Sequence, residues 1–208
     1  LKDNTINDIH ETTDSTIWFA TNGGITRYDG QELSTITQKD GLPFNSVSTI
    51  SSDIKGSLWF GTQAGFSNYD GNRFTQTIAS KELGSSSSAI ESYRSSDGAM
   101  WFTGWRTGAV RYDGRKFEHL TTKDGLPDPN ENVWAINQSP DKSIWFGTIA
   151  GLVRYDGKRI TDVFTVADGL IHNYIQTIYI EEKGTIWLGT PSGISKYSDN
   201  KWTNFTTM

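Results

Sequence analysis

The stretch Gly56-Ser-Leu-Trp-Phe-Gly-Thr62, followed by Gly65 and by Tyr69-Asp-Gly71, decides the fold because variants of it recur along the whole chain. The tryptophans of the recurring phrase stand 41, 42, 44 and 42 residues apart, at Trp18, Trp59, Trp101, Trp145 and Trp187. A fixed period of this length is the signature of repeat architectures. The 208 residues are therefore predicted to form a single domain of five repeats, at about 1–40, 41–82, 83–124, 125–168 and 169–208.

The composition favours an all-β protein. The chain holds eight Trp, eight Tyr, ten Phe and 21 Gly, and no long window shows helical period. The net charge is −5 without a cluster of Lys or Arg, which argues against a nucleic-acid partner or an anionic membrane surface. The absence of Cys excludes disulfides and thiolate metal sites. No apolar run reaches membrane-spanning length and no signal peptide is present, so no membrane contact is expected.

Each repeat divides into four short predicted strands, named A to D in chain order. Strand A is predicted to begin with an apolar residue, at Ile6, Val47, Ile90, Val133 and Ile175. Strand B is the Trp-Phe-Gly-Thr phrase, and strand C runs from a loop glycine to a tyrosine four residues later. Asp-Gly stands between strands C and D in four repeats and Asp-Asn in the fifth, which predicts tight primed turns with positive φ angles.

Strand B is apolar on both faces, because Trp59 and Gly61 point one way while Leu58 and Phe60 point the other. A sheet of this kind needs a neighbouring sheet on each side, and four-stranded units packed radially form a β-propeller. The prediction is an all-β propeller of five four-stranded antiparallel blades, in which Gly61 leaves room for an aromatic ring of the adjoining sheet. Three arrangements remain open: five blades closing alone, part of a longer array, or two chains that close or extend one ring.

Three further phrases carry a family resemblance. They are Asp-Gly-Leu-Pro at 40–43 and 124–127, Trp-Phe-Gly-Thr at 59–62 and 145–148, and Arg-Tyr-Asp-Gly at 27–30, 111–114 and 154–157. With them the chain resembles the two-component-regulator propeller repeats of bacterial sensor proteins. The resemblance implies a periplasmic or extracellular ligand-sensing domain that acts on a signalling output domain, such as a histidine kinase. The family repeat is structural, so it transfers no catalytic residue, and no cofactor or metal is expected.

The B–C and D–A loops lie at the same end of each blade, and they vary between repeats more than the A–B and C–D turns. Variable loops on a rigid scaffold usually carry binding, so this end is the candidate functional face. Repeat 3 differs there, because seven residues separate Trp101 from Gly108, where the other repeats have six. The longer loop carries Trp105 and Arg106, a flat ring beside a fork of donors. Covering a blade edge is the favoured role for Trp105, and ligand contact is the alternative.

Strand A should line the central channel, and its second residue is predicted to be Asn7, Ser48, Glu91, Trp134 and Gln176. Trp134 is the only large ring of this set, and Tyr174 lies nearby in repeat 5; filling the channel is favoured over ligand stacking. Asp128-x-Asn130-x-Asn132 lacks the Gly and Glu of a calcium loop. His172 is the only histidine on the candidate face. The candidate ligand-binding residues are Trp105, Arg106, Asn130, Asn132, Trp134, His172 and Tyr174.

The first functional hypothesis is a non-catalytic sensor propeller that recognises a carbohydrate or another small ligand. A stand-alone five-bladed lectin would carry one similar site per blade, which the different loops disfavour. A scaffold for protein partners is a further alternative. The phrase Trp101-Phe-Thr103 is similar to propeller lyases, but such an enzyme needs a catalytic His with a metal, and the three histidines do not converge by spacing.

Overall fold

Each predicted repeat folds into one four-stranded antiparallel sheet, in which strands that are adjacent in sequence are adjacent in space. The computed structural model describes residues 3–79, 89–130 and 132–206, which hold twenty strands in five sheets. The prediction of an all-β fold with five four-stranded blades is confirmed.

The strand bounds follow the predicted order A to D in every blade. Blade 1 comprises β1 (Ile6–Glu11), β2 (Ile17–Thr21), β3 (Gly24–Tyr28) and β4 (Leu33–Ile36). Blade 2 comprises β5 (Val47–Ser52), β6 (Leu58–Thr62), β7 (Gly65–Tyr69) and β8 (Phe74–Ala79). Blade 3 comprises β9 (Ala89–Arg94), β10 (Met100–Gly104), β11 (Gly108–Tyr112) and β12 (Phe117–Leu120). Blade 4 comprises β13 (Val133–Gln138), β14 (Ile144–Thr148), β15 (Leu152–Tyr155) and β16 (Ile160–Phe164). Blade 5 comprises β17 (Thr177–Ile180), β18 (Ile186–Thr190), β19 (Gly193–Ser198) and β20 (Lys201–Phe205).

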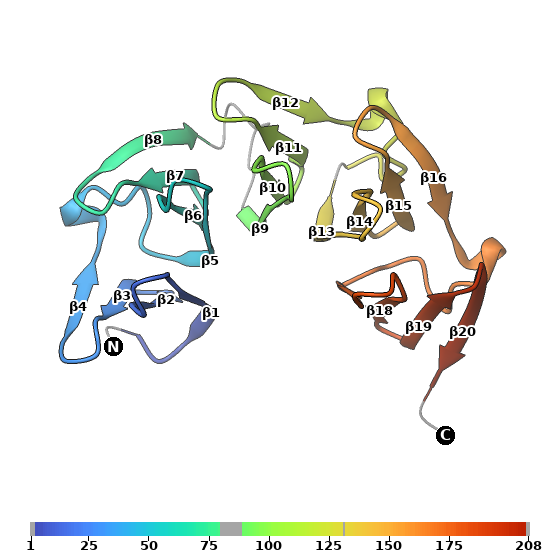
Figure 1. Ribbon diagram of the computed structural model, residues 1–208, viewed down its shortest axis with the longest axis horizontal. Helices are drawn as coiled ribbons and strands as arrows, with labels where there is room; N and C mark the ends of the chain where they lie inside the picture. Colours follow the sequence, from blue (N-terminus) through green and yellow to red (C-terminus); the bar gives the residue numbers. More distant parts are fainter. Residues whose placement is uncertain (1–2, 80–88, 131, 207–208) are drawn as a thin grey trace.

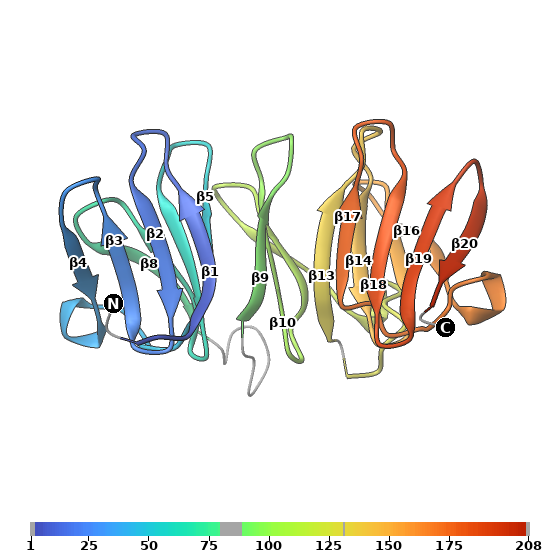
Figure 2. The same cartoon turned by 90° about the horizontal axis from the view of Figure 1, so that it is seen from below.

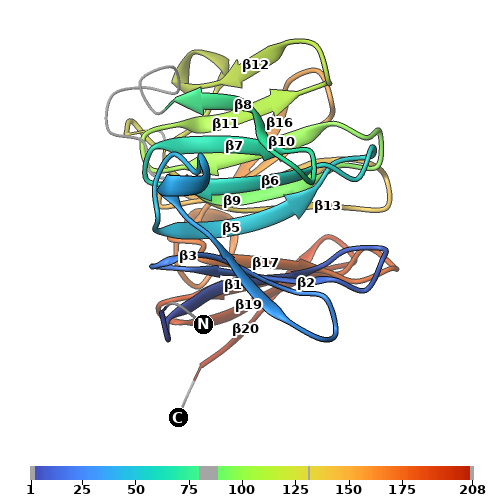
Figure 3. The same cartoon turned by 90° about the vertical axis from the view of Figure 1, so that its left-hand side faces the viewer.

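The five sheets stand radially in an open arc (Figure 1), with β1, β5, β9 and β13 toward the centre and β4, β8, β12, β16 and β20 on the outside. Seen from below and from the side, the sheets face one another instead of joining edge to edge (Figures 2 and 3). Blades 1 and 5 lie at the two ends of the arc, with an opening between them (Figure 1). The five blades of one chain therefore form an arc and do not close a ring.

Aromatic rings join each blade to the next. The ring of Trp59 on β6 lies 4.9 Å from Phe102 and 5.5 Å from Tyr112 of blade 3, measured between ring centroids. The same contacts recur at two other seams, where Trp18 packs on Phe60 and Tyr69, and Trp101 packs on Phe146 and Tyr155. Burial of such large rings, about 150–250 Å² each, makes them the main apolar contribution to the seams.

The two end blades show what a missing neighbour does to the same repeat positions. Ile9 on β1 is 57% exposed, whereas its counterparts Ile50 and Ile136 are 4% and 2% exposed. On the far side of blade 5, Ile194 is 44% exposed, whereas the equivalent Leu152 is fully buried. Both outer faces of the arc therefore present apolar side chains of the kind that the inner seams bury.

The glycine of strand B makes room for a different group from the one predicted. A Cβ on Gly147 would lie 2.9 Å from Cγ2 of Ile175. Ile175 lies just before β17, the inner strand of blade 5. A Cβ on Gly61 would lie 2.5 Å from Cγ2 of Thr49 and 2.8 Å from Cβ of Ala89 in blade 3. The prediction that this glycine makes room for an aromatic ring of the adjoining sheet is therefore wrong. The neighbouring blade places a small or aliphatic side chain beside the glycine, because its inner strand approaches closest here.

Replacing this glycine by alanine should cost stability only where a following blade is present. We expect Gly147→Ala to lower the free energy of unfolding by about 1–3 kcal/mol, because the added methyl overpacks the seam against Ile175. Gly189→Ala is the matched control: its Cβ would lie 2.6 Å from Cγ2 of Thr177, but this side chain is exposed and no following blade holds it, so it can turn away. Urea unfolding of both variants tests this, and equal losses would contradict it.

The Asp-Gly turns between strands C and D differ from the prediction. In blade 1 the carboxylate oxygen Oδ1 of Asp29 accepts the N–H groups of Gln31 and Glu32, at 3.1 and 2.9 Å, and only Gly30 has a positive φ, +93°. The prediction of a two-residue primed turn is wrong for blades 1 to 4, because the aspartate side chain organises a longer loop. Blade 5 does form the primed turn, with Asp199 and Asn200 at φ +51° and +59°.

The inner strands of blades 1 to 4 each carry a β-bulge near their start. The extra residue is Asn7, Ser48, Ile90 and Trp134 in turn. The predicted register of repeat 3 is therefore wrong by one residue: Ala89 pairs with Gly104 as Val47 pairs with Thr62. Ile90 takes the place predicted for Glu91, and Glu91 takes the place of Asp8 one position later. The apolar character of Ile90 caused the error.

Short 3-10 helices form three of the D–A connections, at η1 (Gln38–Asp40), η3 (Thr122–Asp124) and η4 (Val166–Asp168). Each is enclosed by a capping box between a threonine and the aspartate three residues later, and each ends at a glycine in the left-handed region. This accounts for the Asp-Gly-Leu phrase. Within the described residues, no helix has the length and apolarity needed to cross a membrane.

Candidate ligand-binding face

The inner strands begin, and the B–C loops lie, at one end of the arc, which is the lower edge of Figure 2. The antiparallel order of the strands places the D–A connections there as well. All seven candidate residues lie on these loops or at the start of an inner strand, in blades 3 to 5. The question is which of them the fold brings together.

Three of the candidate residues form a continuous aromatic row. The ring of Trp134, at the bulge of β13, lies 5.5 Å from Trp105 of blade 3 and 5.5 Å from Tyr174 of blade 5, between ring centroids. The interplanar angles are 82° and 57°, so the rings form a corrugated wall and not a flat platform. Trp105 is 45% exposed, and Trp134 and Tyr174 are partly exposed. We call Trp105, Trp134 and Tyr174 the aromatic row.

A chain of hydrogen bonds holds the loop that carries Trp105 and Arg106. Arg106 has a left-handed backbone, with φ +57°, and its N–H donates to Oδ1 of Asn132 at 3.0 Å. The N–H of Asn132 donates in turn to Oδ2 of the fully buried Asp128, and the N–H of Asn130 donates to its Oδ1, both at 2.9 Å. Asp128 therefore organises the connection through main-chain N–H groups.

The candidate residues thus divide by role. Asn132 is 5% exposed and accepts the Arg106 N–H, so it positions the loop that carries Trp105 and Arg106. His172 accepts the Tyr174 N–H on Nδ1 at 2.9 Å, which leaves its proton on Nε2 in the neutral ring. The side chains of Arg106 and Asn130 are exposed. Asp128 supports this loop although it was considered only as part of a calcium-loop pattern and not as a candidate ligand-binding residue; its spacing to Asn130 was the available signal.

Removing the Asn132 amide should loosen the Trp105 loop. We expect Asn132→Ala to lower the free energy of unfolding by about 1–3 kcal/mol, because the Arg106 N–H loses its buried partner. Acrylamide quenching of the Trp105 fluorescence should rise. The Trp105 signal is obtained by subtracting the fluorescence of the same protein with Trp105→Phe. Asn130→Ala is the matched control, since its contact to Asp128 uses the main-chain N–H that alanine retains. Unchanged quenching in Asn132→Ala would show that other contacts fix the loop.

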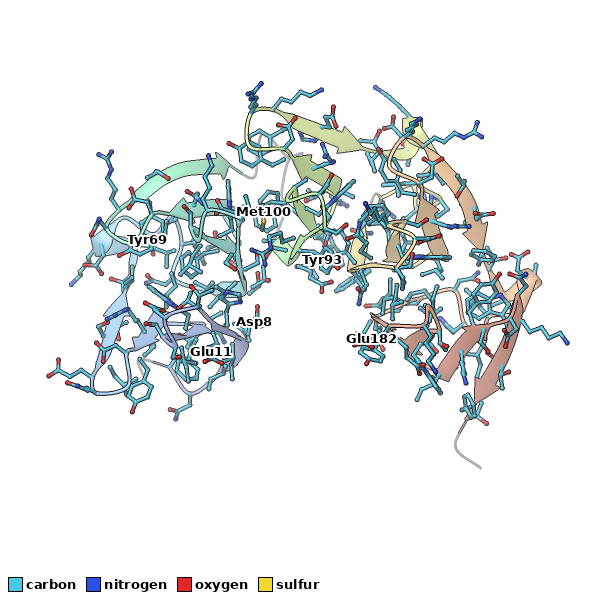
Figure 4. All side chains as sticks on the ribbon, in the orientation of Figure 1. Asp8, Glu11, Tyr69, Tyr93, Met100 and Glu182 are labelled. Carbon is cyan, nitrogen blue, oxygen red and sulfur yellow. The ribbon has the colours of Figure 1, made fainter. Side chains whose placement is uncertain are left out.

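A carboxyl group lies in the seam behind the aromatic row. Glu91 Oε2 accepts the Ile136 N–H at 2.9 Å, two residues beyond Trp134 on β13. Burial raises the pKa of Glu91 to about 7, the hydrogen bond from Ile136 opposes the shift, and the charge of Asp8 adds to it. Asp8 makes the corresponding contact at the first seam, to the Ile50 N–H at 2.8 Å. Asp8 and Tyr93 lie on the inner side of the arc (Figure 4).

Glu91 should make stability depend on pH near neutrality. Its pKa is raised from 4.5 to about 7, so its contribution is fully present below pH 4.5 and is lost as the pH rises through 7. The loss amounts to roughly 3 kcal/mol. Glu91→Gln stays neutral and keeps an acceptor for Ile136, so its stability should exceed that of the wild type increasingly from pH 5 to pH 8. Glu182→Gln, at an exposed site, is the control. The free energy of unfolding is measured with urea at each pH. If it changed with pH equally in the wild type and in Glu91→Gln, the prediction would be wrong.

The described histidines and carboxylates of this face are spread over different blades. In the part of the chain that the structure describes, no group of three or more His, Cys, Asp or Glu side chains is placed to hold a metal ion. His10 lies on β1, His119 on β12 and His172 on the loop before β17. What this face offers is an apolar wall with exposed polar groups at its side.

Comparison with known proteins identifies the repeat. The profile of the two component regulator propeller family matches residues 1–23, 41–64 and 169–192, in repeats 1, 2 and 5. No curated protein sequence matches the chain.

Solved structures share the arrangement of blades. The extracellular domain of BT3049 from B. thetaiotaomicron, named as a hybrid two-component system, is 24% identical with a TM-score of 0.82, over 99% of this chain and 29% of that one. Virginiamycin B lyase from Staphylococcus aureus is 16% identical with a TM-score of 0.77, over 99% and 72%. PorZ from Porphyromonas gingivalis is 15% identical with a TM-score of 0.75, over 97% and 34%. These likenesses establish a common fold, and the chain spans less than a third of the length of the BT3049 extracellular domain. The three matching segments are repeats of the two component regulator propeller type, and the solved structures show that the chain shares the propeller fold.

Proposed function

We propose that the chain is a non-catalytic sensor propeller, the input part of a bacterial two-component-type signalling protein, and that it binds a carbohydrate or another small ligand. The observation that carries this proposal is the aromatic row, in which Trp134 joins Trp105 to Tyr174 across three blades at 5.5 Å spacings. Partly exposed rings can contact the apolar face of a sugar, and the exposed side chains of Arg106 and Asn130 can bind its hydroxyl groups.

The proposed location is periplasmic or extracellular, and the proposed partner in the native protein is a signalling output domain. Support comes from the family of the repeats and from the likeness to extracellular domains of BT3049 and BT4673, the latter with a TM-score of 0.62. The apolar end faces, which include Ile9 and Ile194, are proposed to pack against further protein surface, either another part of the native protein or a second copy that extends the arc.

The alternatives have less support from this geometry. A lectin with one similar site per blade would repeat the row, but the counterparts of Trp105 in blades 1 and 4 are Asn22 and Ile149. The likeness to the lyase is one of fold at 16% identity, and the three histidines lie on different blades. A binding role therefore remains the proposal.

An oligosaccharide array followed by calorimetry with the tightest binder tests the proposal. We expect Trp105→Ala and Trp134→Ala each to weaken binding by at least about tenfold, which corresponds to roughly 1.4 kcal/mol. Phe205→Ala is the matched control, because this exposed ring lies on β20, away from the row. Equal affinity of the wild type and both tryptophan variants would show that the aromatic row is not the binding site. If none of the sugars bound, the proposal of a carbohydrate ligand would be wrong.

A further inference from the structure

In blades 2 and 4 the bulged residue of the inner strand is more exposed than the residues on either side of it. In blade 2, Val47 and Thr49 are 0% and 4% exposed, whereas Ser48 between them is partly exposed. In blade 4, Val133 and Ala135 are 0% and 3% exposed, and Trp134 between them is again partly exposed. A bulge breaks the alternation of a strand and re-aims one side chain, although Ser48 Oγ still donates across the seam to the Ala89 carbonyl of blade 3 at 2.8 Å. The bulged residue differs in kind from blade to blade: it is Asn7, Ser48, Ile90 or Trp134.

The bulged residue meets a B–C loop residue at two places on the rim. In blade 4 the bulged Trp134 contacts Trp105, the first residue after β10. In blade 1 the bulged Asn7 donates from Nδ2 to Oδ1 of Asn22, the first residue after β2, at 3.1 Å. The Trp105–Trp134 contact joins blade 3 to blade 4, whereas the Asn7–Asn22 contact lies within blade 1. One pair is aromatic and the other consists of two amides.

The amide pair has hydrogen-bonding capacity left over. Asn7 Nδ2 also donates to the Val47 carbonyl at 2.7 Å, and Asn22 Oδ1 accepts a second hydrogen bond from Ser46 Oγ at 3.2 Å. Within the described part of the chain, Asn7 Oδ1 and Asn22 Nδ2 have no partner. Both residues are exposed, so the pair offers one acceptor and one donor, and a sugar hydroxyl group can use either.

We propose that Asn7 and Asn22 form a second, polar subsite on the same rim as the aromatic row, and that the ligand which reaches both is an extended oligosaccharide. This inference rests on the proposed function. The inner strands β5 and β9 lie between β1 and β13 along the arc (Figure 1), so a single sugar ring held at Trp134 does not reach the amide pair. A longer chain contacts Trp105 and Trp134 through the apolar face of one unit and the two asparagines through hydroxyl groups of another.

A length series of oligosaccharides tests the subsite. Calorimetry would compare mono- to hexasaccharides of the sugar type that binds best, on the wild type, Asn7→Ala, Asn22→Ala and Asn22→Asp. Affinity for the wild type should rise with chain length. Each alanine variant should lose roughly two- to tenfold for the long sugars and nothing for the shortest ones, the effect of one or two hydrogen bonds. Asn72→Ala is the matched control, since this exposed asparagine lies in a C–D turn at the opposite end of blade 2. Thermal unfolding verifies that each variant is folded.

The outcomes separate the two proposals. Binding that depends on Trp134 but does not grow with chain length, or grows equally in the asparagine variants, would overturn the polar subsite and leave the aromatic row. Absence of binding by any sugar, or binding that is indifferent to Trp105 and Trp134, would refute the proposed function and this inference with it. Asn22→Asp keeps an acceptor for Asn7 and loses the free donor, so a loss equal to that of Asn22→Ala would assign the contact to Asn22 Nδ2.

Discussion

The fold depends on the contact between the tryptophan of one blade and the aromatic residues of the next. Each inner sheet is apolar on both faces, so no blade can cover itself, and Trp59 is covered by residues of blade 3 that include Phe102 and Tyr112. These rings and the aliphatic residues around them pack together sheets that are not paired with one another strand to strand. The exposed Ile9 and Ile194 at the two ends of the arc show the same surfaces without a neighbour.

This packing also determines where the protein can bind. The faces of the sheets pack against neighbouring blades, and the outer strands lie at the periphery. The short turns between strands C and D are organised by the carboxylates of their own aspartates. At the other end, aspartates hold the D–A connections in the same way, but the residues of the B–C loops and bulges differ between blades. The aromatic row and the asparagine pair lie on these loops and bulges and on the connections beside them. The carboxyl of Glu91 lies just behind the row, where its hydrogen bond to Ile136 links blade 3 to blade 4.

Much of this was predictable from the chain alone. The repeat period, the four strands of each blade and the end that carries the variable loops follow from periodic apolar positions and from loop lengths. Trp105, Trp134 and Tyr174 were identified because large rings are unusual at those repeat positions, and the structure brings them together. The register of β9 was predicted wrongly because Ile90 resembles a packed residue, although it is the bulge.

The sequence by itself determined the number of blades, their strand order and the apolar seams, since these arise from short-range pattern and from the burial that the pattern demands. Only the tertiary structure decided that the five blades form an open arc, that the strand-B glycine admits an aliphatic neighbour, and that Asn132 and His172 bond to nearby main-chain N–H groups. The reason is physical: curvature, close approach and hydrogen-bond partners depend on how separate segments meet, and residues such as Asp8 and Ile50 lie a whole repeat apart in the chain.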